Sequence, residues 1–157
     1  MEEKLKELIS NYQVSHSLPR QFYTSETLYK MDIEHYWNHS WIWVGHINQI
    51  PNVGDFFLFD YGYESVIVAR DKNNDVNALL NVCRHRGSRV CLEKSGNTRV
   101  FACPYHAWTY ELNGNLRGAR EMGDSFDKAE HSLKKVNLRI FLSLIHISEP
   151  TRLPGLS

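Results

Sequence analysis

The spacing of apolar residues changes character near residue 40. Before that point, Leu5 and Leu8 begin a pattern with the three- and four-residue spacing of an amphipathic helix, and further short helical patterns follow. Either Ser25 or Thr24 is suited to cap one of these helices, because a side-chain hydroxyl can accept a free backbone N–H. We therefore predict a helical arm over residues 1–40.

From residue 41 onward the pattern is that of short β-strands. Aromatic and β-branched residues gather in brief runs separated by turn-forming residues, at 41–45, 56–59, 65–70, 76–82, 99–102, 108–112 and 136–140. The pair Asn113-Gly114 is the strongest hairpin signal, and residues 115–117 form the returning strand. Many short strands joined by turns predict a mainly β, antiparallel domain over residues 41–141, and not alternating strands and helices.

Residues 142–157 fit neither pattern. They show no periodicity and no capping residues, and they include the run Glu149-Pro150-Thr151-Arg152. The stretch resembles the conceptual translation of a sequencing-adapter fragment. We therefore expect a non-native tail that follows a truncated reading frame.

Composition excludes several classes of protein. The chain has 157 residues with 18 basic and 18 acidic side chains, which is not the excess of positive charge typical of a nucleic-acid binder. No apolar stretch approaches the roughly 20 residues of a membrane-spanning helix, and the start does not resemble a secretory signal. Three cysteines form a poor disulfide framework and indicate a reducing compartment, so we expect a cytoplasmic protein with no nucleic-acid or membrane partner.

Two Cys/His pairs carry the candidate chemistry. Cys83 and His85 are separated by one residue, and Cys103 and His106 are separated by two. Each pair lies in a turn-forming segment after a strand, where a tight loop can direct both side chains at one metal centre. A zinc ion with four ligands and a Rieske [2Fe–2S] cluster both accept this donor set, and the spacing does not choose between them.

The flanking residues show a family resemblance. The segments Asn81–Ser88 and Cys103–Tyr110 resemble the two cluster loops of Rieske non-haem iron oxygenases, within the N-terminal domain of the large subunit. The similarity extends upstream through Leu18–Arg20, Trp41–Gly45 and Gly54–Phe56, and downstream to about Phe141. It implies a small antiparallel Rieske-type β domain.

The resemblance assigns roles to individual residues. It implies that Cys83 and Cys103 ligate one iron through sulfur, and that His85 and His106 ligate the other through Nδ1. Three neighbours complete the expected surroundings of the cluster. Gly87 permits a sharp turn, and Trp108 either shields the centre or simply packs. Arg86, with Arg84 and Arg89, forms a basic edge that is either solvated or docks an acidic electron donor.

Departures from high-potential Rieske proteins are informative. Ser88 and Tyr105 stand where those proteins carry a disulfide, which leaves Cys91 as a spare thiol that we expect to be buried and not a ligand. Ala107-Trp108 replaces a Gly-Ser pair and so removes a hydroxyl donor to the cluster. We therefore expect a reduction potential of roughly −150 mV, near the lower end of the Rieske range.

The resemblance also implies the function. In the family, the cluster passes single electrons to a mononuclear iron in a separate catalytic domain, which this chain is too short to contain. His131 and His146 lack the helical spacing and carboxylate partner of such an iron site. We expect a homo-oligomeric parent oxygenase, fed by a reductase or ferredoxin, acting on quaternary ammonium compounds or aromatic rings. The fragment itself should accept electrons without turning over substrate.

Two alternative functions stay open. A stand-alone Rieske ferredoxin would carry electrons without catalysis, although it would need neither the N-terminal arm nor the strand after Gly118. A structural zinc domain would act as an interaction module instead. A [2Fe–2S] electron paramagnetic resonance signal after reduction would exclude zinc.

Overall fold

The computed structural model describes residues 2–123 and 125–148, and the chain forms two compact units that divide between His39 and Ser40. The first unit is helical, with α1 (Glu2–Ser10), α2 (Gln21–Thr24), α3 (Glu26–His35) and a 3-10 turn (Trp37–His39). Of the two candidate caps for α3, Ser25 serves, because its Oγ accepts the Leu28 N–H at 3.4 Å. The longest described helix has 10 residues, so no helix in this part of the chain could traverse a bilayer.

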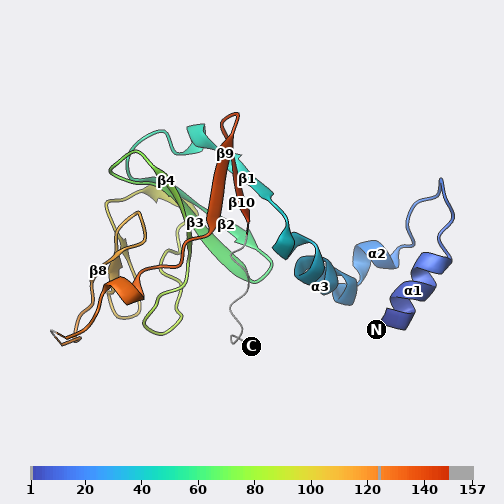
Figure 1. The fold of residues 1–157 in the computed structure, drawn as a ribbon, viewed down its shortest axis with the longest axis horizontal. Helices are drawn as coiled ribbons and strands as arrows, with labels where there is room; N and C mark the ends of the chain where they lie inside the picture. Colours follow the sequence, from blue (N-terminus) through green and yellow to red (C-terminus); the bar gives the residue numbers. More distant parts are fainter. Residues whose placement is uncertain (1, 124, 149–157) are drawn as a thin grey trace. The chain divides into compact units, whose positions relative to one another are not determined.

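The second unit is built from ten short strands (Figure 1). They are β1 (Ile42–His46), β2 (Asp55–Tyr61), β3 (Glu64–Arg70), β4 (Val76–Leu80), β5 (Ser95–Asn97), β6 (Phe101–Ala102), β7 (Thr109–Tyr110), β8 (Leu116–Gly118), β9 (Asn137–Phe141) and β10 (Leu144–Ser148). They form three sheets with the strand orders β1-β10-β9, β4-β3-β2-β5 and β6-β7-β8. All the strand pairs described are antiparallel, which confirms the predicted fold class.

Strand β3 lies at the centre of the unit and is buried on both faces. Its side chains alternate, so Ile67 packs into the core that contains the two Cys/His loops, whereas Val66 and Val68 pack into a second core against β10. This double burial explains why β3 is apolar along most of its length and does not alternate between apolar and polar residues. The sheet that contains β3 therefore packs directly against the core of the two Cys/His loops.

The predicted Asn113-Gly114 turn is present. The Gly114 N–H donates to the Glu111 carbonyl at 2.9 Å, and the Glu111 N–H donates to the Asn115 carbonyl at 2.8 Å. Gly114 has a φ of +92°, and a Cβ placed there would lie 2.8 Å from Leu79 Cδ2. Both the backbone conformation and the close packing therefore require glycine at this position.

The segment after Phe141 differs from the sequence-based picture in part. Residues 144–148 form β10 (Figure 1), which is the middle strand of its sheet. Ile145 and Ile147 are buried in the second core. Buried and half-buried residues alternate along Leu144–Ser148, as expected of a strand. The run is only five residues long and is followed by irregular sequence, so the alternation is hard to recognise in the sequence. The expected tail beyond residue 148 lies outside the described residues, and its non-native origin stays a prediction.

Candidate metal centre

The first loop begins just after β4 and turns back on itself around Cys83. The Cys83 N–H donates to the Ser88 carbonyl at 2.8 Å, and the Gly87 N–H donates to the Cys83 carbonyl at 2.9 Å. Gly87 has a φ of +73°, in the left-handed region, and a Cβ there would meet no atom within 4 Å. Glycine is therefore favoured at position 87 by the backbone conformation and not by crowding.

The second loop, between β6 and β7, repeats this arrangement. The Cys103 N–H donates to the Trp108 carbonyl at 2.8 Å, and the Ala107 N–H donates to the Cys103 carbonyl at 2.9 Å. Ala107 occupies the position equivalent to that of Gly87 and has a φ of +56°. The second loop thus holds a non-glycine residue in a conformation that carries a modest steric cost.

The two loops bring their cysteine thiols together in the core. Cys83 and Cys103 are each 3% exposed, and both are free thiols. Burial raises the pKa of the Cys103 thiol, and the adjoining Cys83 side chain raises it further, against hydrogen bonds from the Tyr105 and His106 backbone N–H groups. Two buried thiols in contact, with N–H donors aimed at one of them, form a site suited to bound thiolates.

Tyr110 on β7 is a neighbour of the thiols to which the sequence analysis gave no role. Its side chain is fully buried, and its hydroxyl lies 3.3 Å from Cys83 Sγ while accepting the Arg84 N–H at 3.0 Å. Burial raises the pKa of Tyr110 well above its usual value, so the phenol stays protonated. Either the phenol O–H or the Cys83 S–H can donate in this contact, and once Cys83 is a thiolate only the phenol can.

The two histidines also meet. The ring centroids of His85 and His106 are 4.6 Å apart, and the His85 ring stacks on Trp108 at 4.8 Å with an angle of 7° between the planes. His85 Nδ1 is buried without a hydrogen-bond partner in the described part of the chain. Burial, followed by the charges of His106 and Arg86, lowers the pKa of His85 and so favours the neutral imidazole that binds metals.

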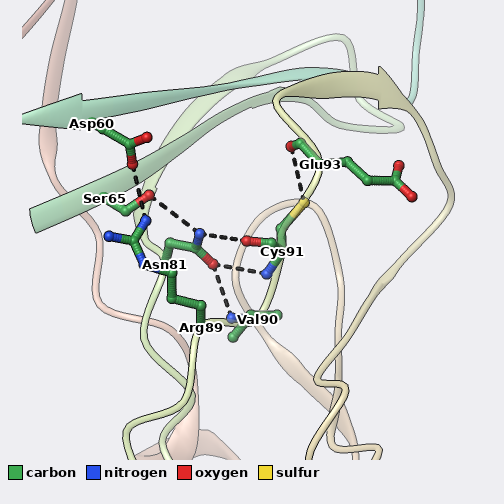
Figure 2. Close-up of polar contacts among 7 residues, drawn as sticks. All are labelled: Asp60, Ser65, Asn81, Arg89, Val90, Cys91 and Glu93. Atoms are coloured by element: carbon green, nitrogen blue, oxygen red, sulfur yellow. Dashed lines mark hydrogen bonds and ion pairs between the residues drawn. The ribbon is translucent and has the colours of Figure 1, made fainter.

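The outer side of the loops is aromatic and basic. Tyr105 is 59% exposed, and its ring centroid is 3.9 Å from that of His106. Arg84 and Arg86 are exposed on the first loop, whereas Arg89 pairs with Asp60 at 2.9 Å (Figure 2). The exposed end of the site therefore carries positive charge beside an aromatic ring.

The remaining candidate residues lie outside the two pairs of proposed ligands. Cys91 is buried, with its Sγ 3.6 Å from the Glu93 carbonyl oxygen (Figure 2). The His131 ring packs edge-on against the Trp108 ring, with the two centroids 5.9 Å apart. His146 lies on β10 opposite Trp43. Within the described ranges, no group of three or more Cys, His, Asp or Glu side chains forms a site for a single metal ion.

Comparison with known sequences identifies the family of this domain. Residues 40–137 match the Rieske [2Fe-2S] domain family. The glycine betaine monooxygenase oxygenase subunit of Chromohalobacter salexigens is 38% identical over 131 residues, which cover 83% of this chain and 29% of that protein. The large oxygenase component of salicylate 5-hydroxylase from Ralstonia sp. is 40% identical, over 87% of this chain and 37% of that protein.

Solved structures show the same relationship. Naphthalene 1,2-dioxygenase from Rhodococcus sp. aligns with a TM-score of 0.83 at 30% identity, over 93% of this chain and 34% of that one. A quaternary ammonium Rieske monooxygenase in complex with gamma-butyrobetaine aligns with a TM-score of 0.79 at 31% identity, over 93% and 42% respectively. This chain thus spans about a third of the length of its curated relatives. It belongs to the Rieske [2Fe–2S] domain family and corresponds to the N-terminal region of Rieske oxygenase large subunits.

Proposed function

We propose that the two loops hold a [2Fe–2S] cluster with Cys83 and Cys103 on one iron and His85 and His106 on the other, and that the domain transfers single electrons within a Rieske oxygenase. The observation that carries this proposal is that the two sulfur donors adjoin each other and the two imidazole donors adjoin each other. A cluster with unlike iron atoms requires this arrangement. A single zinc ion would instead need all four donors around one point.

The unpartnered nitrogen supports the same assignment. A buried polar atom without a hydrogen bond is costly, and His85 Nδ1 is such an atom in the protein alone. A metal bond at this nitrogen would satisfy it. Trp108 restricts the ring by stacking on it, so His85 is already oriented for binding.

When bound, a cluster of this kind supplies a one-electron redox centre with no open position for substrate. The chain's own residues do the rest. The first and second loops fix the four donors, Tyr110 and backbone N–H groups donate hydrogen bonds toward the sulfurs, and Trp108 covers the His85 ring. These contacts exclude water from the sulfur side, while the histidine side lies toward the exposed Tyr105.

We propose that electrons arrive from an external reductase or ferredoxin with an acidic surface. The exposed guanidinium groups of Arg84 and Arg86 would attract such a donor to the histidine side of the loops. Because exposed charges are screened by salt, the rate of reduction should fall as ionic strength rises. An R84E/R86E variant should weaken that salt dependence, as measured by stopped-flow reduction.

The relatives named above include enzymes whose names specify glycine betaine and salicylate as substrates. One domain thus recurs in proteins with chemically different substrates, which fits a role in electron supply. We propose that the parent protein is an oxygenase with its substrate site in the remaining two thirds of its length. A quaternary ammonium substrate is our first choice, supported by relatives of that class.

The decisive test compares the chain with its C83S/C103S variant after anaerobic loading with iron and sulfide. We expect two iron atoms per chain, visible absorbance, and an electron paramagnetic resonance signal on reduction, all lost in the variant. A C91S variant is the matched control, because Cys91 is a buried thiol outside the donor set, and it should keep its iron. A colourless protein with one zinc per chain would refute the proposal.

A further inference from the structure

The side chain of Asn81 lies fully buried at the entrance to the first loop, and its amide uses every hydrogen-bonding position it has (Figure 2). Its Oδ1 accepts the backbone N–H groups of Val90 at 2.9 Å and Cys91 at 2.8 Å. Its Nδ2 donates to the Cys91 carbonyl at 2.7 Å and to Ser65 Oγ at 3.3 Å. A buried amide with four partners leaves no polar group unsatisfied.

These contacts join the two ends of one loop. The segment between Asn81 and Cys91 contains Cys83 and His85, and three of the four side-chain bonds run from its first residue to its last two. The backbone of Asn81 is also held, because its N–H donates to the Ser65 carbonyl at 2.8 Å. One residue therefore closes the loop and anchors it to β3.

A surface pair fastens the same loop a second time. Arg89 donates to Asp60 at 2.9 Å (Figure 2), and the Ser65 side chain, followed by Arg89, lowers the pKa of the Asp60 carboxyl. The side chains of Arg89 and Asp60 are 47% and 63% exposed, and exposed ion pairs contribute little. The buried amide of Asn81 is therefore the stronger tie.

We infer that Asn81 is a positioning residue for the metal centre, which sets the distance and orientation of Cys83 and His85 by closing the loop that carries them. This inference rests on the proposed function. Asn81 has no contact with either proposed ligand side chain among its described bonds, so it acts through the backbone. Groups that hydrogen-bond a metal ligand directly change metal affinity on the order of tenfold to a hundredfold, and we take the lower end of that range for a residue that acts through the backbone.

The test measures the rate at which the oxidised, cluster-loaded chain releases iron to a chelator. Asn81→Ala removes all four side-chain bonds and should release iron on the order of tenfold faster. Asn81→Asp keeps the acceptor bonds to Val90 and Cys91 but sets a carboxyl oxygen against the Cys91 carbonyl oxygen in a buried site, so it should also release iron faster than the unaltered chain. The electron paramagnetic resonance spectrum of the reduced Asn81→Ala protein should also shift or broaden, because the ligands are less well held.

A control separates positioning from general destabilisation. Val68→Ala leaves a cavity in the second core, away from the loops, and should lower the melting temperature without a matching rise in iron release. If Asn81→Ala releases iron no faster than Val68→Ala when both are measured equally far below their melting temperatures, the inference is wrong. If Asn81→Ala gives no soluble chain, unchanged release in both Asn81→Asp and Ser65→Ala would overturn it.

A parallel Cys83→Ser sample distinguishes this inference from the proposed function. Iron that stays bound in Cys83→Ser would refute the ligand assignment, whatever Asn81 does. Iron that is lost in Cys83→Ser but retained normally in the Asn81 variants would leave the function intact and refute only the role of Asn81.

Discussion

Replacing Tyr110 with Phe removes one hydroxyl and little else, so it tests how the protein sets the reduction potential. The phenol lies 3.3 Å from Cys83 Sγ and accepts the Arg84 N–H at 3.0 Å, and it must donate to the sulfur when Cys83 is a metal-bound thiolate. Reduction adds negative charge to the cluster, and a donor to a ligand sulfur stabilises that charge. Loss of the donor should therefore lower the potential.

The size of the effect follows from the hydrogen bond. A bond to a charged group contributes about 1.5–3 kcal/mol, of which we take about 1 kcal/mol to depend on the added electron. For a one-electron couple, a tenfold change in equilibrium constant, or about 1.4 kcal/mol, corresponds to about 59 mV. Tyr110→Phe should therefore lower the potential by about 40 mV.

The assay is a redox titration of the loaded protein followed by visible circular dichroism. Tyr63→Phe is the matched control, because Tyr63 is 76% exposed in the turn between β2 and β3. This variant should have the same reduction potential as the unaltered protein. The Arg84 N–H loses its acceptor in Tyr110→Phe, so unfolding should also become easier by about 1 kcal/mol. A potential that stays the same or rises would refute the assignment of the phenol as a donor to sulfur.

Three further predictions concern stability. Trp108→Ala should lower the free energy of unfolding by about 3–5 kcal/mol in urea, because the indole is 2% exposed in the core; a surface-like loss of about 0.5 kcal/mol would contradict its packing role. Gly87→Ala should lower the free energy of unfolding by about 1 kcal/mol, because φ at this position is +73°. Ala107→Gly removes the strain of a φ of +56°, so it should leave the stability unchanged or raise it. Thermal melts that shift equally downward for both variants would contradict the equivalence of the two loops. The pKa of Asp55 is lowered chiefly by the Asn97 side chain, so its carboxylate stabilises the fold above the unfolded pKa of 3.8, and this stability is lost as pH falls through the lower folded value. Asp55→Asn should therefore flatten the decline in stability below pH 3.8, and an unchanged acid profile would show that the interaction has no such effect.

The sequence predicts the local features of this protein well. The Asn113-Gly114 turn, a helix cap at Ser25 or Thr24 and most of the short strands each follow from residues within a few positions of one another. The two Cys/His pairs stand out for the same reason, because their spacing is a property of each loop alone. The structure brings the two loops together.

The residues that support the site could not be predicted in this way. Tyr110 meets Cys83 from 27 positions away, and the Asn81 amide bonds residues at the far end of its loop and on β3. Such contacts depend on how the sheets pack, which neither periodicity nor motif spacing encodes. A partial signal existed for Tyr110, since the sequence predicts a strand over residues 108–112, and residues two apart on a strand share a face, which would place Tyr110 beside Trp108.

Strand β10 has a practical consequence for anyone preparing a shorter form of this domain. It is the only bridge between β1 and β9 in the described part of the chain, so a protein cut after Phe141 would expose the unpaired amides of two edges at once. It would also expose the apolar residues of the second core that Ile145 and Ile147 cover. Bare edges beside an apolar surface recruit further chains, so such a truncation would tend to self-associate through β-sheet extension.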